Sequence, residues 1–266
     1  RPVSRQPNVE DWLYVPSWKR SQLPDALAAE LTIRANPLTW LIFLDGCGVG
    51  DRLVERLRDL GQSVWTVVPG DRWQAKGDQA REQMGDRALT INPGNPADFD
   101  QMIEYLQQRN QRPTKIIHGW TITAATQPDF SLASVHQTQR LGLHTLLSLA
   151  QSLGKQPHFP DTDLIAIVNG VHEVTGDEPT LPAQSTLLAP IKVLPLEYPH
   201  LKCRSLDIVL PAGDRTYPAQ AIDLLLAECL SASPDADIAY RGRTRWLPTY
   251  IPAQVSKTDK PSETGN

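Results

Sequence analysis

The stretch Trp40–Gly50 reads WLIFLDGCGVG, a short apolar run followed at once by a loop with three glycines. Leu53, Leu57 and Leu60 follow at a spacing near 3.6 residues, which predicts a helix with one apolar face. A strand, a tight turn and a helix therefore succeed one another, as they do at the start of a dinucleotide-binding unit. This order predicts an α/β fold that begins near residue 40.

The glycine loop is incomplete as a cofactor fingerprint. The pattern G-x-G-x-x-G needs a third glycine three residues after the second, where helix and strand pack closely. Counting from Gly48 and Gly50 puts Leu53 at that place. Counting from Gly46 and Gly48 puts Asp51 there, an anion at a helix N-terminus where a phosphate would bind. We therefore interpret Gly46, Gly48 and Gly50 as a vestigial loop that serves a Rossmann-like fold and holds no cofactor.

Cys47 lies inside this loop, at a helix N-terminus, where a thiol can have a lowered pKa. A nucleophile elbow has glycine two residues away on either side, but Asp45 and Val49 occupy those positions. We therefore expect a small buried cysteine and no nucleophile.

The rest of the body alternates short apolar runs with amphipathic segments. Strand and helix in turn predict a doubly wound parallel sheet, here a truncated or pseudo-Rossmann one of short-chain dehydrogenase type. Further strands are expected at residues 63–68, 88–91, 115–118, 163–169 and 205–210, and helices at residues 99–106, 132–153, 183–193 and 219–230. The inner side of helix 132–153 is predicted to carry Leu143, Leu146, Leu147, Ala150 and Leu153.

Composition excludes several classes of protein. The chain has 266 residues, 40% of them hydrophobic, and a net charge of −4, which gives no basic footprint for nucleic acid. The sequence holds no apolar run long enough for a membrane span and no signal segment, and its three cysteines lack CxxC spacing. We expect a cytoplasmic protein with reduced thiols. No metal site is expected, because His136 and His144 have no further ligand at a suitable spacing.

The two ends differ from the body. Residues 1–10 and 251–266 are polar and contain prolines, so we expect linkers around one domain at residues 11–250, the second leading toward a following domain. Trp12–Trp18 and Ile238–Tyr250 are aromatic, extended segments that can pair as an antiparallel ribbon. Their aromatic residues either anchor a neighbouring domain or pack as ordinary edge strands, and both interpretations stay open. These residues are Trp12, Tyr14, Trp18, Tyr240 and Trp246.

A reductase triad can be sought in the sequence. Ser185, Tyr198 and Lys202 have the order of the Ser, Tyr-x-x-x-Lys set of short-chain dehydrogenases, in which lysine lowers the tyrosine pKa for proton transfer. However, the expected fifth strand ends at Asn169, well before Ser185. Pro199 follows Tyr198 directly, so Tyr198 and Lys202 cannot share a helix face. We therefore expect no catalytic residue.

The sequence also disfavours two other cofactor sites. Asp71 and Arg72 follow the second strand, where a ribose or a 2′-phosphate ligand of a dinucleotide would stand, but a solvated loop is expected there. An S-adenosylmethionine-dependent methyltransferase would need a carboxylate at the end of that strand, and Val68 and Pro69 occupy the place.

Several short motifs stand at intervals along the chain. They are Asp11-Trp12-Leu13-Tyr14 with Trp18, Trp40-Leu41-Ile42-Phe43 with Asp45, His118-Gly119-Trp120, Val168-Asn169-Gly170, Glu197 with Pro199, Leu201, Cys203, Arg204 and Asp207, and Ala239-Tyr240-Arg241 with Arg245. Together they resemble one family, the N-terminal half of ketoreductase domains in modular type I polyketide synthases. The similarity covers residues 11–250 and is most specific between Glu197 and Asp207.

This resemblance implies a noncatalytic structural subdomain, inactive alone, within a multienzyme of secondary metabolism. In that family a separate catalytic half binds NADPH and reduces β-ketoacyl chains on acyl carrier protein, and the first strand and the exit segment of the structural half help to join the two. The alternative is a complete NADPH-dependent short-chain dehydrogenase that uses the Gly46–Gly50 loop with Tyr198 and Lys202.

Overall fold

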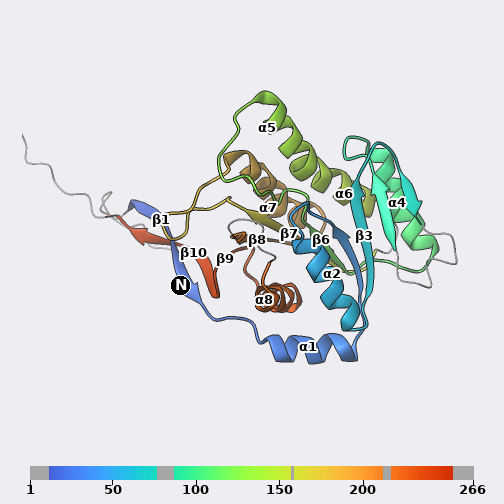
Figure 1. Ribbon diagram of the computed structural model, residues 1–266, viewed down its shortest axis with the longest axis horizontal. Coiled ribbons are helices and arrows are strands. Elements are labelled where there is room, and N and C mark those ends of the chain that lie inside the picture. Colours follow the sequence, from blue (N-terminus) through green and yellow to red (C-terminus); the bar gives the residue numbers. More distant parts are fainter. Residues whose placement is uncertain (1–11, 77–86, 157–158, 212–216, 254–266) are drawn as a thin grey trace, which may run out of the picture.

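One mixed sheet forms the centre of the molecule, with helices on both of its faces (Figure 1). The computed structural model describes residues 12–76, 87–156, 159–211 and 217–253. The strand order in these residues is β1-β10-β9-β8-β7-β6-β2-β3-β5-β4. Its antiparallel strands are β1 (Tyr14–Ser21), β10 (Thr244–Pro252) and the short edge strand β4 (Gln74–Lys76), which pairs with β5. The parallel strands are β2 (Thr39–Phe43), β3 (Ser63–Pro69), β5 (Ala88–Ile91), β6 (Lys115–His118), β7 (Thr162–Asn169), β8 (Leu201–Ile208) and β9 (Asp237–Arg241). The predicted doubly wound parallel sheet is therefore confirmed.

Strand β2 shows how the sequence builds two cores. Leu41 and Phe43 point to one face of the sheet, and Trp40 and Ile42 to the other. Because side chains alternate along a strand, a run that is apolar throughout must be covered on both faces. All four side chains are 0% exposed.

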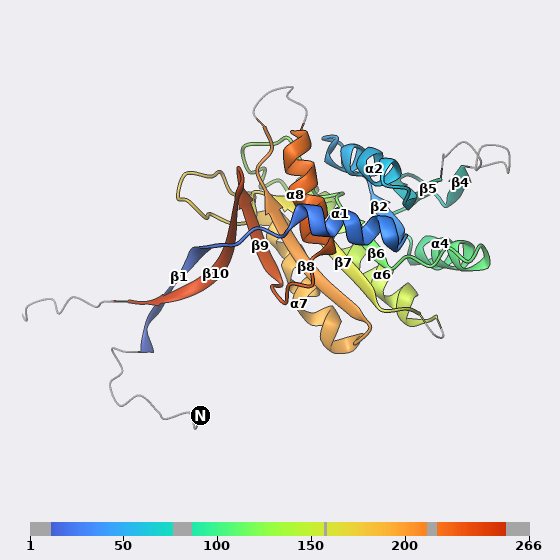
Figure 2. The ribbon, with the colours of Figure 1, turned by 90° about the horizontal axis from the view of Figure 1, so that it is seen from below.

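Helices supply both covers (Figure 2). The first core is closed by α4 (Pro96–Gln108), α6 (Thr145–Gly154) and α7 (Leu188–Glu197), and the second by α1 (Ala26–Ala35), α2 (Val49–Asp59) and α8 (Ala219–Leu230). Within the described part of the chain, the other helical segments are α5 (Leu132–Gln139), the π-helical turn η2 (Arg140–His144) and the 3₁₀ turn η3 (Pro182–Leu187). Among the described residues, no helix is both long and apolar enough to cross a bilayer.

The helix predicted over residues 132–153 contains one unpredicted irregularity, the turn η2. The Nε2–H of buried His118 donates to the carbonyl oxygen of Leu141 in that turn at 2.9 Å. A π turn adds a residue and so rotates the inner face of the helix. As a result Leu149 is fully buried and Leu147 is 38% exposed, which corrects the predicted inner side. Leu143 is also only partly buried.

A two-stranded ribbon, β1 (Tyr14–Ser21) with β10 (Thr244–Pro252), continues the sheet and projects past the helices (Figures 1 and 2). This confirms the predicted pairing of the two aromatic segments. The ribbon reaches Pro252, two residues beyond the expected end of the domain at residue 250. The linkers expected at residues 1–10 and at the end of the chain from residue 254 lie outside the described residues.

One face of the ribbon alternates aromatic residues with prolines across the two strands. Cross-strand partners share a face, so we call this set the aromatic–proline face. Its pairs are Tyr14 with Pro252, Pro16 with Tyr250, and Trp18 with Pro248.

The prolines do not interrupt the ribbon's hydrogen bonds. The N–H of Ala253 donates to the carbonyl oxygen of Leu13 at 2.8 Å, which makes this a hydrogen-bonded pair. Such pairs alternate with non-hydrogen-bonded ones, so residues of the aromatic–proline face direct their N–H positions away from the partner strand. Pro16, Pro248 and Pro252 therefore occupy places where an inward donor is not needed.

Candidate functional site

The glycine loop stands at the carboxyl end of β2, where the chain order reverses between β3 on one side and β6 on the other. In open α/β sheets this crevice is where ligands bind. Gly48 has a left-handed φ of 84°, which lets the chain turn directly into α2. The fold therefore places the vestigial loop where a cofactor loop would lie.

The carboxylate of Asp45 fills the turn. Its Oδ1 accepts hydrogen bonds from the N–H of Cys47 at 2.7 Å and of Val49 at 3.2 Å, and its Oδ2 from the N–H of Gly50 at 2.5 Å. Asp45 is 7% exposed. The free N–H groups at the start of α2 are the donors that hold a phosphate in a dinucleotide site. Here the chain's own carboxylate takes them.

The charge of Asp45 affects its neighbours. Burial and then the Asp45 charge raise the pKa of the Cys47 thiol, and the same two causes, with Glu55, raise the pKa of Asp51. A thiol with a raised pKa is a poor nucleophile. Cys47 is partly buried, and its Sγ lies 3.8 Å from the carbonyl oxygen of Ile122, which supports a structural cysteine.

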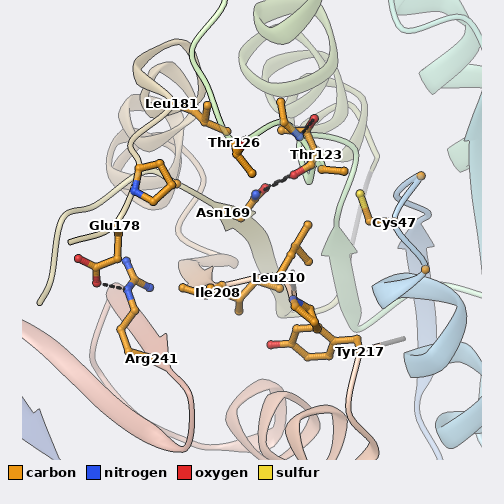
Figure 3. Close-up of a pocket in the computed structure, with 18 of the residues that line it drawn as sticks. Cys47, Thr123, Thr126, Asn169, Glu178, Leu181, Ile208, Leu210, Tyr217 and Arg241 are labelled. Carbon is orange, nitrogen blue, oxygen red and sulfur yellow. Dashed lines mark hydrogen bonds and ion pairs between the residues drawn. The ribbon is translucent and has the colours of Figure 1, made fainter. Parts of the chain in front are cut away.

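A cavity of about 800 Å³ opens beside the loop, at the carboxyl ends of β6, β7 and β8 (Figure 3). Its wall after β7 is Asn169, which is tied to the backbone of Thr123 in both directions: Thr123 N–H to Oδ1 at 3.0 Å and Nδ2 to Thr123 O at 2.8 Å. Asn169, which ends β7, the strand expected as the fifth, therefore has both polar atoms of its amide hydrogen-bonded to Thr123. It can join two loops but offers no hydroxyl for proton transfer.

The opposite wall of the cavity carries an ion pair. Arg241 Nε donates to Glu178 Oε1 at 2.6 Å, and its Nη2 to Asp207 Oδ2 at 3.0 Å. Burial alone would raise the pKa of Glu178, but hydrogen bonds from Arg241 and the Thr175 N–H lower it to about 2. Burial raises the pKa of Asp207 against the pull of Arg241. The Arg241 guanidinium is thus paired with the carboxylates of Glu178 and Asp207, an arrangement typical of an ion pair that holds a loop in place.

The candidate triad lies elsewhere. Tyr198 follows α7 and packs against Gly154, while Lys202 is the second residue of β8, at the amino ends of the parallel strands. The glycine loop is at the carboxyl ends, and a strand as long as β8 spans roughly 23 Å at about 3.3 Å per residue. Ser185 Oγ donates to the carbonyl oxygen of Pro182 at 2.7 Å within η3. The structure therefore does not bring Tyr198 and Lys202 to the glycine loop, as the alternative of a complete dehydrogenase would need.

The other sequence candidates take no part in a site. Asp71, Arg72, His136 and His144 are exposed. Among residues 12–76, 87–156, 159–211 and 217–253, no group of three His, Cys, Asp or Glu side chains is placed to hold a metal ion.

The five aromatic residues considered as partner anchors divide into two groups. Trp12 is 47% and Tyr14 51% exposed, but Tyr240 is 4% exposed and donates its hydroxyl to Glu228 Oε2 at 2.7 Å. Tyr240 is thus a core residue, which favours the packing interpretation for this ring. Trp18 and Trp246 are partly covered, Trp18 by the ring of His172 at 4.9 Å and Trp246 by the guanidinium of Arg20 at 5.3 Å.

The base of the ribbon holds a buried ionic cluster that the sequence analysis did not predict. Arg245 on β10 donates to both oxygens of Glu228 on α8, at 2.7 and 3.1 Å, and to Ser21 Oγ on β1 at 3.0 Å. Glu228 is 0% and Arg245 3% exposed. The cluster therefore fastens both strands of the ribbon to the body of the domain. Its one signal in the sequence is a charged residue inside an apolar helix.

One family model matches most of the chain. Residues 42–226 match the model of the family described as Beta-ketoacyl synthase-like, N-terminal. No curated protein matches the sequence.

Solved structures share the fold at low sequence identity. A ketoreductase from the macrolactin assembly line is 16% identical with a TM-score of 0.69, over 93% of this chain and 46% of that chain. A multidomain structure with a ketoreductase, from a keto acid-selecting non-ribosomal peptide synthetase module, is 20% identical with a TM-score of 0.74, over 90% of this chain and 18% of that one. A short-chain dehydrogenase from Burkholderia cenocepacia in complex with NADP is 11% identical with a TM-score of 0.53, over 75% of this chain and 94% of that one. The chain thus spans less than half of the ketoreductase-containing chains it matches.

Proposed function

Because the chain belongs to the Beta-ketoacyl synthase-like, N-terminal family, we propose that it is the noncatalytic structural subdomain of a polyketide synthase ketoreductase. It would support a separate, NADPH-binding half that reduces β-ketoacyl chains on acyl carrier protein, inside a cytoplasmic multienzyme of secondary metabolism. The chain itself would bind no cofactor.

The observation that carries this proposal is that the residues able to transfer a proton lie far from the crevice. Tyr198 and Lys202 lie toward the amino ends of the strands, and Asn169, at the crevice, is bonded to Thr123. A reductase needs its proton donor within hydrogen-bond reach of the substrate. This chain keeps the shape of the fold without that arrangement, so its contribution is packing.

The ribbon is the surface that we assign to the partner half. Beyond the body of the domain, Tyr14, Val15, Tyr250 and Ile251 are 51%, 49%, 70% and 50% exposed. Tyr14 and Tyr250 lie on the aromatic–proline face, and Val15 and Ile251 pair on the opposite face, so both faces of the ribbon expose large apolar side chains. Exposed apolar surface of this kind typically marks a contact with another protein. The residues of the aromatic–proline face combine rigid rings and prolines, which lose little conformational entropy on binding.

The first test is a calorimetric titration of the chain with NADPH up to millimolar concentration, with NADH and S-adenosylmethionine as controls. We expect no binding heat in any of the three titrations. Micromolar NADPH binding would contradict the proposal and would make the glycine loop a working cofactor site.

The second test supplies the catalytic half in trans and measures association and reductase activity. Tyr14→Ser with Tyr250→Ser is expected to weaken association at least about tenfold, as loss of two buried aromatic contacts implies. The matched control is Leu31→Ser, because Leu31 is 61% exposed on α1, away from the ribbon. Equal effects of the ribbon change and the control would refute the assignment of this surface.

Tyr198→Phe serves as the catalytic control in the same assay. Its hydroxyl has no role in the proposed function, so the activity of the reconstituted pair should stay unchanged. A loss of activity with intact association would return Tyr198 to the candidate catalytic residues.

A further inference from the structure

A second cavity lies beside the one in Figure 3 and shares part of its wall, Thr123 and Leu181. Its volume is about 530 Å³, and its walls are the loop after β6, the helix α5 and the turns η2 and η3. Figure 1 shows α5 and the loop before it at one end of the domain. We propose that this cavity binds a small, neutral, mainly apolar molecule with a hydrogen-bond donor, and that Gln184 and Thr121 hold its polar group. The proposal goes beyond the proposed function and does not rest on it.

Two buried polar side chains stand in the wall of this cavity without a partner. Gln184 is 3% and Thr121 6% exposed, and both line the cavity. Among the described residues, neither Gln184 Oε1 nor Thr121 Oγ1 has a hydrogen-bond partner. Buried polar atoms are costly to leave unpaired, so both atoms call for a further partner. An amide oxygen accepts and a hydroxyl donates or accepts, so a ligand with a donor satisfies Gln184 and can also pair with Thr121.

The rest of the wall suits an apolar molecule. Trp120, Ile122, Val135, Leu141 and Leu181 supply most of its large side chains. Cavities of roughly 300–1,000 Å³ that combine apolar walls with a few polar groups are typical of small-molecule sites. Water gains little from such walls, whereas an apolar molecule gains by leaving water.

The charge of the wall favours a neutral ligand. Among the described residues that line the cavity, only Asp129 is charged, and it is exposed. The N–H of Ser131 donates to Asp129 Oδ1 at 2.8 Å, and this hydrogen bond lowers the pKa of Asp129. An anion would therefore approach a carboxylate, and a cation would lose its hydration inside the cavity without a buried counter-charge.

Helix α5 forms one wall and is not packed onto the core. Within its described residues, α5 buries no side chain. The half-buried Ser134, Val135 and Thr138, together with Leu141 in η2, lie on one face of the helix, and all four line the cavity. The continuation of the helix, α6, packs onto the core instead. The inner face of α5 therefore faces the cavity, where a bound molecule would cover it.

The π turn η2 positions two residues of this wall. Leu141 lines the cavity, and its carbonyl oxygen is fixed by the hydrogen bond from His118. Thr121 packs against the same turn, because a Cβ placed on Gly142 would stand 3.0 Å from Thr121 Cγ2. Such turns inside α-helices occur frequently at functional sites. The irregularity of the helix thus coincides with the cavity.

Octanamide is the probe, because it combines an apolar chain and no charge with an N–H₂ donor. Methyl octanoate has the same acyl chain without a donor, and octanoate carries a charge in place of the amide. Each compound is titrated calorimetrically into the wild-type chain. We expect octanamide to bind at least about fivefold tighter than either control, which is the gain expected from one hydrogen bond.

Gln184→Leu removes the acceptor and should weaken octanamide binding at least about fivefold, so that its advantage over methyl octanoate falls below about twofold. Because Gln184 Oε1 has no partner among the described residues, this variant should keep the thermal midpoint of the wild type. Gln151→Leu makes the same change at an exposed position of α6 and should leave the binding of both ligands unchanged. If Gln184→Leu does not fold, Thr121→Val, which removes the other unpaired atom, should also weaken octanamide binding.

Val135→Trp tests the cavity itself, because the larger ring fills the space beside α5. This variant should show no octanamide binding, whereas His136→Trp, with the same ring at the next and exposed position, should bind as the wild type does. Equal binding by these two variants would overturn the proposal, as would equal wild-type affinity for octanamide and methyl octanoate. The absence of any binding heat with octanamide would mean that water alone serves Gln184 and Thr121, and would overturn it too. The proposed function is tested separately, by NADPH and by association with the catalytic half.

Discussion

Glu228→Gln tests how the ribbon is fastened to the domain. In the wild type, Glu228 Oε2 accepts hydrogen bonds from Arg245 Nε and from the Tyr240 hydroxyl, each at 2.7 Å, and Oε1 accepts one from Arg245 Nη2 at 3.1 Å. Glutamine fits the same space but carries no charge and turns an N–H₂ group toward the guanidinium. Arg245, which is 3% exposed, is then a buried cation that has lost its main partner.

Breaking a buried ion pair by removing one member costs about 3–5 kcal/mol of unfolding free energy. Arg245 keeps Asp235 at 3.0 Å, so the lower end of that range, about 3 kcal/mol, is expected. For a domain of this size the loss corresponds to a fall of roughly 6–12 °C in the thermal midpoint. Urea unfolding followed by circular dichroism measures the free energy.

The control is Glu55→Gln, the same chemical change in a pair on the surface. Glu55 contacts Arg52 at 3.0 Å with its side chain 64% exposed, so a loss of at most about 1 kcal/mol is expected. A similar small loss in Glu228→Gln would refute the argument, because it would mean that strand pairing alone holds the ribbon.

Three further predictions concern the core, the loop and the thiols. Burial lowers the pKa of His118 from 6.5 to about 4, so only the unfolded chain gains this proton as the pH falls from 6.5 to 4. The unfolding free energy should therefore drop by about 3 kcal/mol between pH 6.5 and pH 4 because of His118. Below pH 4, His118 should contribute no further change. His118→Gln keeps an amide that can donate to Leu141 but has no titrating ring. Its unfolding free energy, measured by urea unfolding at a series of pH values, should fall less between pH 6.5 and pH 4 than that of the wild type. Gly48→Ala should cost about 1–2 kcal/mol, since φ is 84° there, whereas Gly46→Ala, with open space and no positive φ, should cost almost nothing in the same unfolding assay. With iodoacetamide at pH 8, Cys47 should react first but more slowly than a free thiol, and the two buried cysteines, whose pKa burial raises to about 12, should be unlabelled by mass spectrometry until the protein unfolds.

Much of the fold could be predicted because its strands are apolar and its turns are marked by glycine, proline and asparagine. The strands Ala88–Ile91 and Lys115–His118 and the helix Ala219–Leu230 begin and end where the sequence predicts. Helix α1 was not predicted, because Ile33 is its one buried residue and Leu27 and Leu31 face outward, which leaves no apolar stripe to detect. The π turn at Arg140–His144 likewise has no periodic signal, since it depends on contacts made by other strands.

The site was predicted in part, for a similar reason. The incomplete glycine pattern is visible in the sequence, and it indicates Asp51 as an anion that disfavours phosphate. The carboxylate that takes the donors is Asp45, and its direction depends on the left-handed turn at Gly48, which has no signal in the sequence. For Tyr240 the sequence left the anchor and packing interpretations open, because alternation along β9 separates two faces without telling which one α8 covers.

The three prolines of the ribbon also govern what it cannot do. An unpaired strand edge is a template for polymerisation, because its free N–H and C=O groups can recruit a strand from another molecule. Pro16 removes such a donor from the outer rim of β1, and Pro248 and Pro252 do so on β10 beyond its pairing with β9. The ribbon can therefore expose apolar side chains on both of its faces and still resist edge-to-edge pairing with copies of itself. In the proposed function, this would let the ribbon stay exposed until the partner half is in place.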